Sequence, residues 1–305
     1  MSVLGIDLGG TQSKLGIVEH GTVTDTFVCD TPVEAGYEAV VQSLAKGAQT
    51  LLRLGGDVKL VGLASPGLVE NGVVRFSNNF GWHDRPLAAD LQAALKLPVK
   101  MANDAQCAAL GEALHGAGRG FSRVAMLTVG TGVGGGFIRD GQVETAGYGA
   151  FAYIFGHMAA EHNGKQCNCG RRGCLECYAS ATAVALAGSR MLKRDATARE
   201  IFDAARAGNA SACEIVAQMA DYLAQGAVNI ANVLRPHLIV IGGGVSGSCD
   251  LLLPQINAAL CRDVYAYAYA PVKAVCAMLG NRAGLVGAAC LWKNEADSKE
   301  QPAED

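Results

Sequence analysis

The sequence predicts an α/β protein with two domains, and three observations support this prediction. Short β-prone runs alternate with amphipathic helical segments along most of the 305 residues. A strand, a glycine-threonine turn and a second strand occur near the start and again near the middle, as an internal duplication would produce. The length corresponds to about two domains of ordinary size. We expect domains at 1–116 and 117–282, with a C-terminal helix at 283–297 completing the first.

The composition excludes several classes of protein. Net charge is -3 and the basic residues are scattered, which argues against a nucleic-acid partner. No apolar run approaches the roughly 20 residues needed to span a bilayer, and the first ten residues do not resemble a secretory signal. The 11 cysteines are an odd number spread from Cys29 to Cys290, unlike a small disulfide scaffold. We expect a cytoplasmic protein with no membrane partner.

The first strand, at 3–8, leads into a turn that can bind phosphate. Two glycines leave backbone N–H groups accessible, a threonine hydroxyl lies beside them, and Asp7 can hold a hydrated Mg²⁺ next to the phosphate. The turn residues are Gly9, Gly10 and Thr11. The alternative is an ordinary hairpin turn without a ligand.

The remaining elements of the first domain follow from the hydrophobic pattern and the turn residues. They are helices at 37–54, 86–95 and 105–114 and strands at 59–64, 72–76 and 98–102. The loop at 77–82 contains Asn79, whose amide suits recognition of hydroxyl groups or simply caps a turn. Asp104 follows the strand at 98–102, at the carboxyl end where ligands of open α/β sheets gather, so it is a candidate general base. The alternative is that Asp104 caps the next helix.

The second domain begins with a strand at 124–129 and the glycine-rich turn at 130–136. Two similar hairpins can bind a polyphosphate from opposite sides, which strengthens the phosphate interpretation of the first turn. This segment is neither a Walker loop nor a Rossmann fingerprint. Further elements are helices at 178–192, 198–207, 210–234, 251–260 and 283–292 and strands at 237–241 and 271–275. Gly242, Gly243 and Gly244 follow the strand at 237–241, where bare backbone can pack on a flat ring such as adenine. The charged tail at 293–305 is expected to be disordered.

The loop at 156–176, GHMAAEHNGKQCNCGRRGCLE, predicts a zinc site. The candidate ligands are His157, Cys167, Cys169 and Cys174. Three thiolates and one imidazole at this spacing suit tetrahedral Zn²⁺. Four protein ligands leave no position for water, so we expect the ion to stabilise the loop and not to take part in chemistry. The alternative is free thiols in a cysteine-rich chain. Glu176 ends the loop with a carboxylate beside this ordered segment.

Together these motifs resemble the ROK family of sugar kinases and related repressors, within the actin-like (ribonuclease-H-like) ATPase superfamily. The most specific motif is GHM followed by CNCGRRGCLE, supported by DLGGT, the ND before a helix, GTGVGGG and IGGGV. The resemblance covers almost the whole ordered chain. It implies a two-domain actin-like ATPase fold with a zinc-stabilised loop in the second domain, ATP and Mg²⁺ as cofactors, and a homodimer.

The resemblance also implies a role for each matching residue. It makes Asp104 the catalytic base in contact with the substrate, and it assigns sugar hydroxyl contacts to Asn79, Asn103, His157 and Glu176. It assigns the phosphates to Asp7, Gly9, Gly10, Thr11, Thr131 and Gly132, the adenosine pocket to Gly243 and Gly244, and zinc to His157, Cys167, Cys169 and Cys174.

One segment departs from the family pattern. The family has Gly-x-x-Gly-x-Ala-Gly-Glu-Ile-Gly-His, where this chain has GYGAFAYIFGH at 147–157. The sugar-binding Glu is replaced by Ile154, the Gly before it by Tyr153, and an earlier Gly by Ala150. We therefore expect a kinase of a hexose, amino sugar or cyclitol with a preference changed from glucose. The alternative is that Glu161 replaces the missing carboxylate.

Two other functions fit the same motifs. A DNA-binding repressor would need a helix-turn-helix module, and the first strand begins at Val3 without room for one. A catalytically silent sugar sensor is the second, and the presence of Asp104 argues against it.

Overall fold

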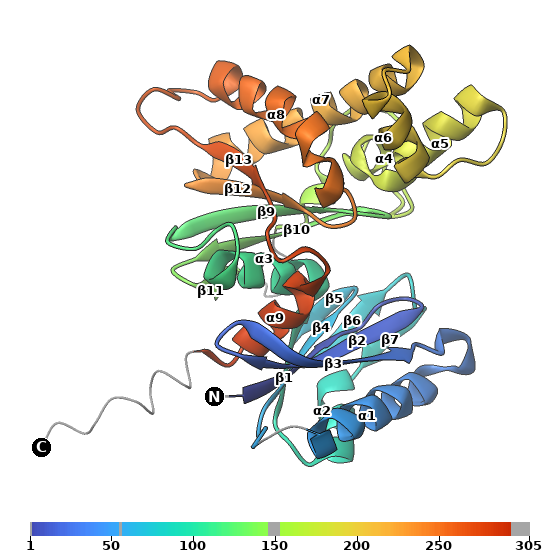
Figure 1. Cartoon of the computed structure of the whole chain (residues 1–305), viewed down its shortest axis with the longest axis vertical. Coiled ribbons are helices and arrows are strands. Elements are labelled where there is room, and N and C mark those ends of the chain that lie inside the picture. Colours follow the sequence, from blue (N-terminus) through green and yellow to red (C-terminus); the bar gives the residue numbers. More distant parts are fainter. Residues whose placement is uncertain (1, 55–56, 146–152, 294–305) are drawn as a thin grey trace, which may run out of the picture. The chain divides into compact units, whose positions relative to one another are not determined.

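The computed structural model describes residues 2–54, 57–145 and 153–293 (Figure 1). The chain forms two compact units. Unit 1 comprises Met1–His115, Val143–Ala152 and Arg282–Asp305, and unit 2 comprises Gly116–Gln142 and Tyr153–Asn281. The tail expected to be disordered lies outside the described residues from position 294, as does the end of the helix expected at 283–297.

Unit 1 is built on a five-stranded sheet whose parallel strands end at one edge. The strand order is β3 (Thr22–Asp30), β2 (Gln12–Glu19), β1 (Ser2–Asp7), β4 (Val61–Ser65) and β8 (Val99–Asn103). β1 pairs antiparallel with β2 and parallel with β4, and β4 pairs parallel with β8. The predicted opening hairpin is thus confirmed. The register aligns Asp7 with Ala64 and Ser65 with Asn103, so the carboxyl ends of three strands meet.

Helices pack on this sheet through their small or apolar residues. In α1 (Tyr37–Leu54) the predicted 3.6-residue pattern is confirmed, because Val40, Leu44 and Leu51 are fully buried. α3 (Asp104–His115) and α9 (Ala283–Cys290) pack against each other within unit 1. A Cβ at Gly111 of α3 would lie 2.5 Å from the Ala283 carbonyl oxygen, so glycine allows this close approach.

A second, three-stranded sheet follows β4 in unit 1. It consists of β5 (Leu68–Glu70), β6 (Val73–Ser77) and β7 (Trp82–Arg85), and α2 (Leu87–Leu95) comes next. The sequence predicted only β6 and α2. β5 and β7 are three and four residues long and carry charged residues, so their hydrophobic alternation is too short to detect.

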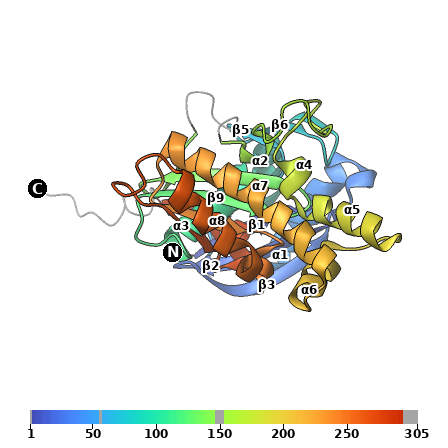
Figure 2. The ribbon, with the colours of Figure 1, turned by 90° about the horizontal axis from the view of Figure 1, so that it is seen from above.

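Unit 2 repeats the strand order of unit 1, which confirms the predicted duplication. Its order is β11 (Gln142–Val143), β10 (Val133–Arg139), β9 (Arg123–Val129), β12 (Leu238–Gly242) and β13 (Lys273–Cys276). Counted along the strands of each five-stranded sheet, both orders read third, second, first, fourth and fifth. α7 (Ala210–Leu234) and α8 (Cys249–Asp263) lie side by side over this sheet (Figures 1 and 2).

The helix predicted at 178–192 is two helices. α4 (Glu176–Ala179) ends at Ser180, and α5 (Ala181–Leu192) begins after it. Ser180 has extended backbone angles and its Oγ accepts a hydrogen bond from Ala183 N, so the serine caps α5 and interrupts the helix. α6 (Ala198–Arg206) begins at a capping box formed by Thr197 and Glu200. Within the described ranges, no helix is long and apolar enough to cross a membrane.

Candidate active site and metal centre

The carboxyl edge of the unit 1 sheet carries two carboxylates. β1 ends at Asp7, and β8 ends at Asn103 immediately before Asp104, the first residue of α3. β4 lies between β1 and β8, and parallel strands are about 4.8 Å apart, so the two strand ends are about 10 Å apart. The structure therefore brings Asp7, Asn103 and Asp104 to one edge.

Asn103 performs the helix-capping role that the sequence also allowed for Asp104. Its Oδ1 accepts hydrogen bonds from Ala105 N at 2.9 Å and from Gln106 N at 3.3 Å. Its Nδ2 donates to the Gly67 carbonyl oxygen at 2.9 Å, and the second N–H of the amide is not used in that bond. Asp104 Oδ1 accepts from the neighbouring Ala105 N, at 2.8 Å, and the Asp104 carboxyl also interacts with the Asn103 side chain. Capping is thus mainly the role of Asn103.

The surroundings of the two carboxyl groups favour their protonated forms. Burial raises the pKa of Asp104 to about 6, and the negative charge of Asp7 adds to this increase. Burial also raises the pKa of Asp7, although Lys14 opposes it. Asp104 as a whole residue is half-buried, but its carboxyl group is surrounded by protein atoms. The pKa depends on the surroundings of the carboxyl group. A carboxylate with a pKa near 6 is a competent proton acceptor at neutral pH.

The first glycine-threonine turn faces solvent. Gly10 and Thr11 are exposed, whereas a Cβ at Gly9 would overlap the Gln12 carbonyl oxygen. The turn thus requires glycine at position 9 for steric reasons. Sequence reasoning missed Gly284 of α9. A Cβ there would lie 3.1 Å from all three carboxyl atoms of Asp7, so glycine leaves space around this carboxylate.

Asn79 lies in the turn between β6 and β7 and is exposed. The turn closes through Gly81 N and the Asn78 carbonyl oxygen, at 3.4 Å, and not through the Asn79 side chain. The alternative in which Asn79 caps this turn therefore gains no support from the hydrogen bonds.

In unit 2 the second glycine-threonine turn lies against the glycine segment that follows β12. Gly130 N donates to the Gly132 carbonyl oxygen at 2.9 Å, and Thr182 Oγ1 donates to the Thr131 carbonyl oxygen at 2.7 Å. Gly243 has a φ of +83°, and a Cβ there would lie 2.6 Å from the Val129 carbonyl oxygen. A Cβ at Gly244 would lie 3.8 Å from the Gly130 Cα. The proposed phosphate and adenosine segments of unit 2 are thus adjacent.

The four predicted metal ligands come together. One candidate ligand atom from each of His157, Cys167, Cys169 and Cys174 lies within 4.8 Å of the others. The Cys169 and Cys174 sulfurs are 3.6 Å apart, and Cys167 Sγ is 3.8 Å from His157 Nδ1. Zn–S and Zn–N bonds of tetrahedral zinc imply separations of about 3.6 to 3.8 Å between ligand atoms. The geometry fits a tetrahedral ion better than a group of unrelated thiols.

Glu176 connects this cluster with the second turn. Its Oε2 accepts a hydrogen bond from Val133 N at 3.0 Å, and its Oε1 lies 3.8 Å from Cys167 Sγ. A Cβ at Gly132 would overlap the Glu176 carboxylate. Position 132 therefore requires glycine because a larger residue would clash with the Glu176 carboxylate. The sequence did not indicate this contact.

Ile154 lies three residues before the candidate ligand His157, and the Ile154 carbonyl oxygen accepts a hydrogen bond from His157 N at 3.1 Å. The Ile154 residue is 41% exposed. Tyr153 has a φ of +61° and packs against Phe137 and Phe155. Ala150, the third replaced position, lies outside the described residues.

Glu161, the alternative source of a carboxylate, already has a partner. Its Oε1 accepts a hydrogen bond from Tyr222 OH at 2.9 Å, and Tyr222 stacks on Tyr178 with ring centroids 4.5 Å apart. Using Glu161 in place of the missing glutamate would break this bond.

Residues 3–295 match the model of the ROK family. The chain belongs to the ROK family. A glucokinase from Thermotoga maritima is 36% identical over 316 residues, covering 96% of this chain and 98% of the relative. An N-acetylmannosamine kinase from Haemophilus influenzae is 31% identical over 297 residues, covering 96% of each.

Solved structures agree with this family assignment. The structure of a ROK family glucokinase from Streptomyces griseus, in complex with glucose and AMPPNP, matches with a TM-score of 0.85 and 31% identity. The match covers 96% of this chain and 100% of that one. The predicted α/β fold of the actin-like ATPase type is therefore confirmed.

Proposed function

We propose that this ROK protein is an ATP-dependent kinase that phosphorylates a hydroxyl group of a sugar or sugar-like polyol. The observation that carries the proposal is Asp104. Asp104 lies at the carboxyl edge of the unit 1 sheet, where ligands of such sheets bind. Asn103 makes most of the hydrogen bonds that cap α3, and the Asp104 pKa of about 6 suits a general base. The sugar kinases among its relatives support the same reaction.

In this reaction Asp104 accepts the proton of the attacking hydroxyl group. The side chain of Asn103, which also interacts with the Asp104 carboxyl, and the exposed amide of Asn79 would contact neighbouring substrate hydroxyls. The proposed phosphate contacts of ATP are Gly9, Gly10 and Thr11 in unit 1 and Thr131 and Gly132 in unit 2. Adenosine would pack on the backbone of Gly243 and Gly244. Mg²⁺ bound near Asp7 would neutralise charge on the transferred phosphoryl group. Its positive charge would also offset the repulsion between Asp7 and Asp104.

His157 and the three cysteines would bind a structural zinc ion. Such an ion holds the loop at 156–176 in one conformation, and Glu176 extends this order to the second turn through Val133 N. His157 and Glu176 would then present polar atoms to the sugar from an ordered loop.

Ile154 makes glucose a poor substrate in this proposal. A carboxylate that accepts bonds from two hydroxyls contributes roughly 1.5 to 3 kcal/mol per bond, and an exposed isoleucine leaves those hydroxyls unpaired. The preferred substrate should lack the two hydroxyls, direct them elsewhere, or carry an apolar group that Ile154 and Tyr153 cover. The bond between Glu161 and Tyr222 argues against a substitute carboxylate.

A coupled ADP-release screen over hexoses, amino sugars, N-acetylated sugars and cyclitols tests the function. We expect turnover with at least one of them in wild type and loss of turnover in Asp104→Asn. A protein that binds a sugar and releases no ADP with any of them would instead be a sugar sensor. The homodimer and the cytoplasmic location stay predictions, which analytical ultracentrifugation and cell fractionation would test.

A further inference from the structure

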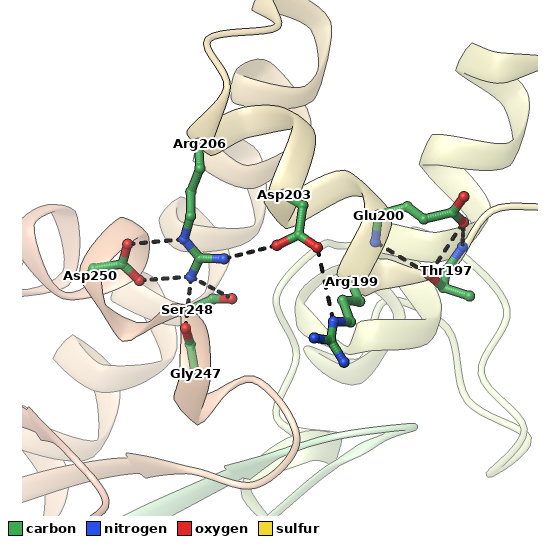
Figure 3. A network of polar contacts seen from close by, with 8 residues as sticks. All are labelled: Thr197, Arg199, Glu200, Asp203, Arg206, Gly247, Ser248 and Asp250. Atoms are coloured by element: carbon green, nitrogen blue, oxygen red, sulfur yellow. Dashed lines mark hydrogen bonds and ion pairs between the residues drawn. The ribbon is translucent and has the colours of Figure 1, made fainter.

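Arg206, the last residue of α6, is bonded to the segment that connects β12 to α8 (Figure 3). Its Nη2 donates to the Gly247 carbonyl oxygen at 2.7 Å and to Ser248 Oγ at 3.2 Å. Nη2 and Nε also reach the two carboxylate oxygens of Asp250, at 3.0 and 3.2 Å. Asp203 Oδ1 accepts from Nη1 at 3.2 Å and holds the other side of the guanidinium group.

The same segment is fixed at its other end by backbone contacts with β9. Val245 N donates to the Val129 carbonyl oxygen at 3.2 Å, and Gly243 lies against the Val129 backbone. The chain then makes a 3-10 turn, Ser246–Ser248, and the Ser246 carbonyl oxygen accepts a hydrogen bond from Cys276 Sγ of β13 at 3.2 Å. The residues at 243–248 are thus held by β9 at one end, by β13 at Ser246 and by Arg206 at the other end.

The pair between Arg206 and Asp203 in the last turn of α6 is an ordinary helix-stabilising contact, but the contacts of Arg206 with the start of α8 are not. Ser248 precedes α8, but its hydroxyl makes no capping bond to that helix and binds Arg206 instead. A cation beside the first turn of a helix also opposes the helix dipole. The ion pair is partly exposed, with side-chain exposures of 35% for Arg206 and 58% for Asp250, and such pairs contribute little to global stability.

We propose that Arg206 is a positioning residue for ATP, which fixes the 243–248 segment in the conformation that receives adenosine. The inference rests on the proposed adenosine contacts of Gly243 and Gly244. Gly243 and Gly244 have no side chains to restrain them, so their conformation depends on what holds the residues that follow. Val245 is buried in the core and fixes the middle of the segment, and Arg206 fixes its end at 247–248. The bidentate contact with Asp250 provides geometric precision that a lone charge lacks.

Loss of this contact should weaken ATP binding and leave sugar binding unchanged. When only a fraction of molecules has the competent conformation, the apparent dissociation constant rises by the inverse of that fraction. For Arg206→Ala we expect the KM for ATP to rise about three- to tenfold, since tenfold corresponds to about 1.4 kcal/mol. Arg206→Lys should recover only part of this loss. Lysine keeps the positive charge, but its ammonium group cannot form the two parallel hydrogen bonds of the planar guanidinium group.

The experiment compares wild type, Arg206→Ala, Arg206→Lys, Asp250→Asn and the control Arg199→Ala. Arg199 lies on the same helix, is 91% exposed at its side chain, and forms a long ion pair with Asp203, at 3.9 Å. The measurements are the KM for ATP, the KM for the sugar, kcat, the thermal midpoint and the dissociation constant of AMPPNP by calorimetry. Asp250→Asn should shift the ATP constants in the same direction as Arg206→Ala, and the double variant should not be additive.

The inference is supported if Arg206→Ala raises the KM for ATP and the dissociation constant of AMPPNP at least about threefold while the sugar KM and the thermal midpoint stay unchanged. In Arg199→Ala the same two nucleotide constants should equal those of wild type. Unchanged ATP constants overturn it, as does an equal loss of sugar and ATP affinity accompanied by a lower thermal midpoint. If wild type binds AMPPNP but turns over no sugar, the kinase proposal fails and calorimetry still tests Arg206. If wild type binds no nucleotide, both are wrong.

Discussion

Replacing Asp104 with asparagine should abolish turnover and at the same time stabilise the protein. The substitution keeps the size of the side chain and keeps an oxygen that can accept the bond from Ala105 N. It removes the proton acceptor and also removes a charge that the surroundings disfavour. A purely structural role for this aspartate would predict a less stable variant.

The size of the stabilisation follows from the pKa. Each pKa unit is worth about 1.36 kcal/mol, so raising the pKa of Asp104 from 3.8 to about 6 costs the folded state at most about 3 kcal/mol once the carboxyl is ionised. Part of the residue is open to water, which screens the effect, so we expect about 1 to 3 kcal/mol. Loss of a general base lowers kcat by about 10² to 10⁴.

The pH dependence has a defined sign. Below pH 3.8 the carboxyl is protonated in the folded and unfolded states, and the variant has no advantage. As the pH rises from 3.8 to about 6, the unfolded state loses its proton first, so wild type loses stability relative to the variant. The difference should be about half its full size at pH 5 and constant above about pH 7.

The assay combines coupled ADP release with thermal unfolding at pH 5 and pH 7.5. The control is Asp25→Asn on the exposed face of β3, which should change stability by less than about 0.5 kcal/mol. A variant of Asp104 that keeps more than about a tenth of wild-type kcat would refute the general-base role. A variant that is no more stable than wild type at pH 7.5 would refute the account of burial.

Three further predictions follow. For wild type, kcat/KM should fall about tenfold per pH unit below about pH 6, because protonated Asp104 cannot accept a proton; a profile flat to pH 5 would contradict this. Metal analysis of protein purified under reducing conditions should find one zinc per chain, and zinc-free protein would reject the site. Cys169→Ser should destabilise the protein by more than about 4 kcal/mol. The control Cys261→Ser, at an exposed cysteine, should not. Ile154→Glu should raise kcat/KM for glucose about 10²-fold or more, with Ile154→Gln as the neutral control; a wild-type value near 10⁴ M⁻¹ s⁻¹ or above would show that Ile154 does not control specificity.

The elements that the sequence predicted well are those with a strong local signal. The repeated strand, glycine-threonine turn and strand identified the duplication, because turn residues and β-prone runs are local properties. The ligand spacing at His157 to Cys174 predicted the cluster for the same reason, since short loops limit how far the ligand atoms can separate. Asp104 was located at a strand end from pattern alone.

Two kinds of feature could not be predicted: a local break within a helical pattern, and contacts between residues that are distant in the sequence. The Ser180 interruption depends on a local competition between a cap and a continuous helix, which the apolar period does not show. The space that Gly284 leaves around Asp7 arises between residues 277 positions apart, 284 minus 7, and needs the folded sheet. The fork between Arg206 and Asp250 joins two helices whose sequence signals are independent.

The two five-stranded sheets share one strand order, and each unit carries an inserted segment between strands of this shared framework. Between β4 and β8 the first unit carries an added sheet with Asn79, and between β11 and β12 the second carries Ile154, His157 and Glu176. The proposed phosphate and adenosine segments instead lie directly at the strands of the repeated framework. We therefore expect substitutions in these two excursions to change the preferred acceptor while the phosphoryl donor stays the same. Glu176 is the exception, because it is bonded to Val133 N and lies against Gly132 of the proposed phosphate turn.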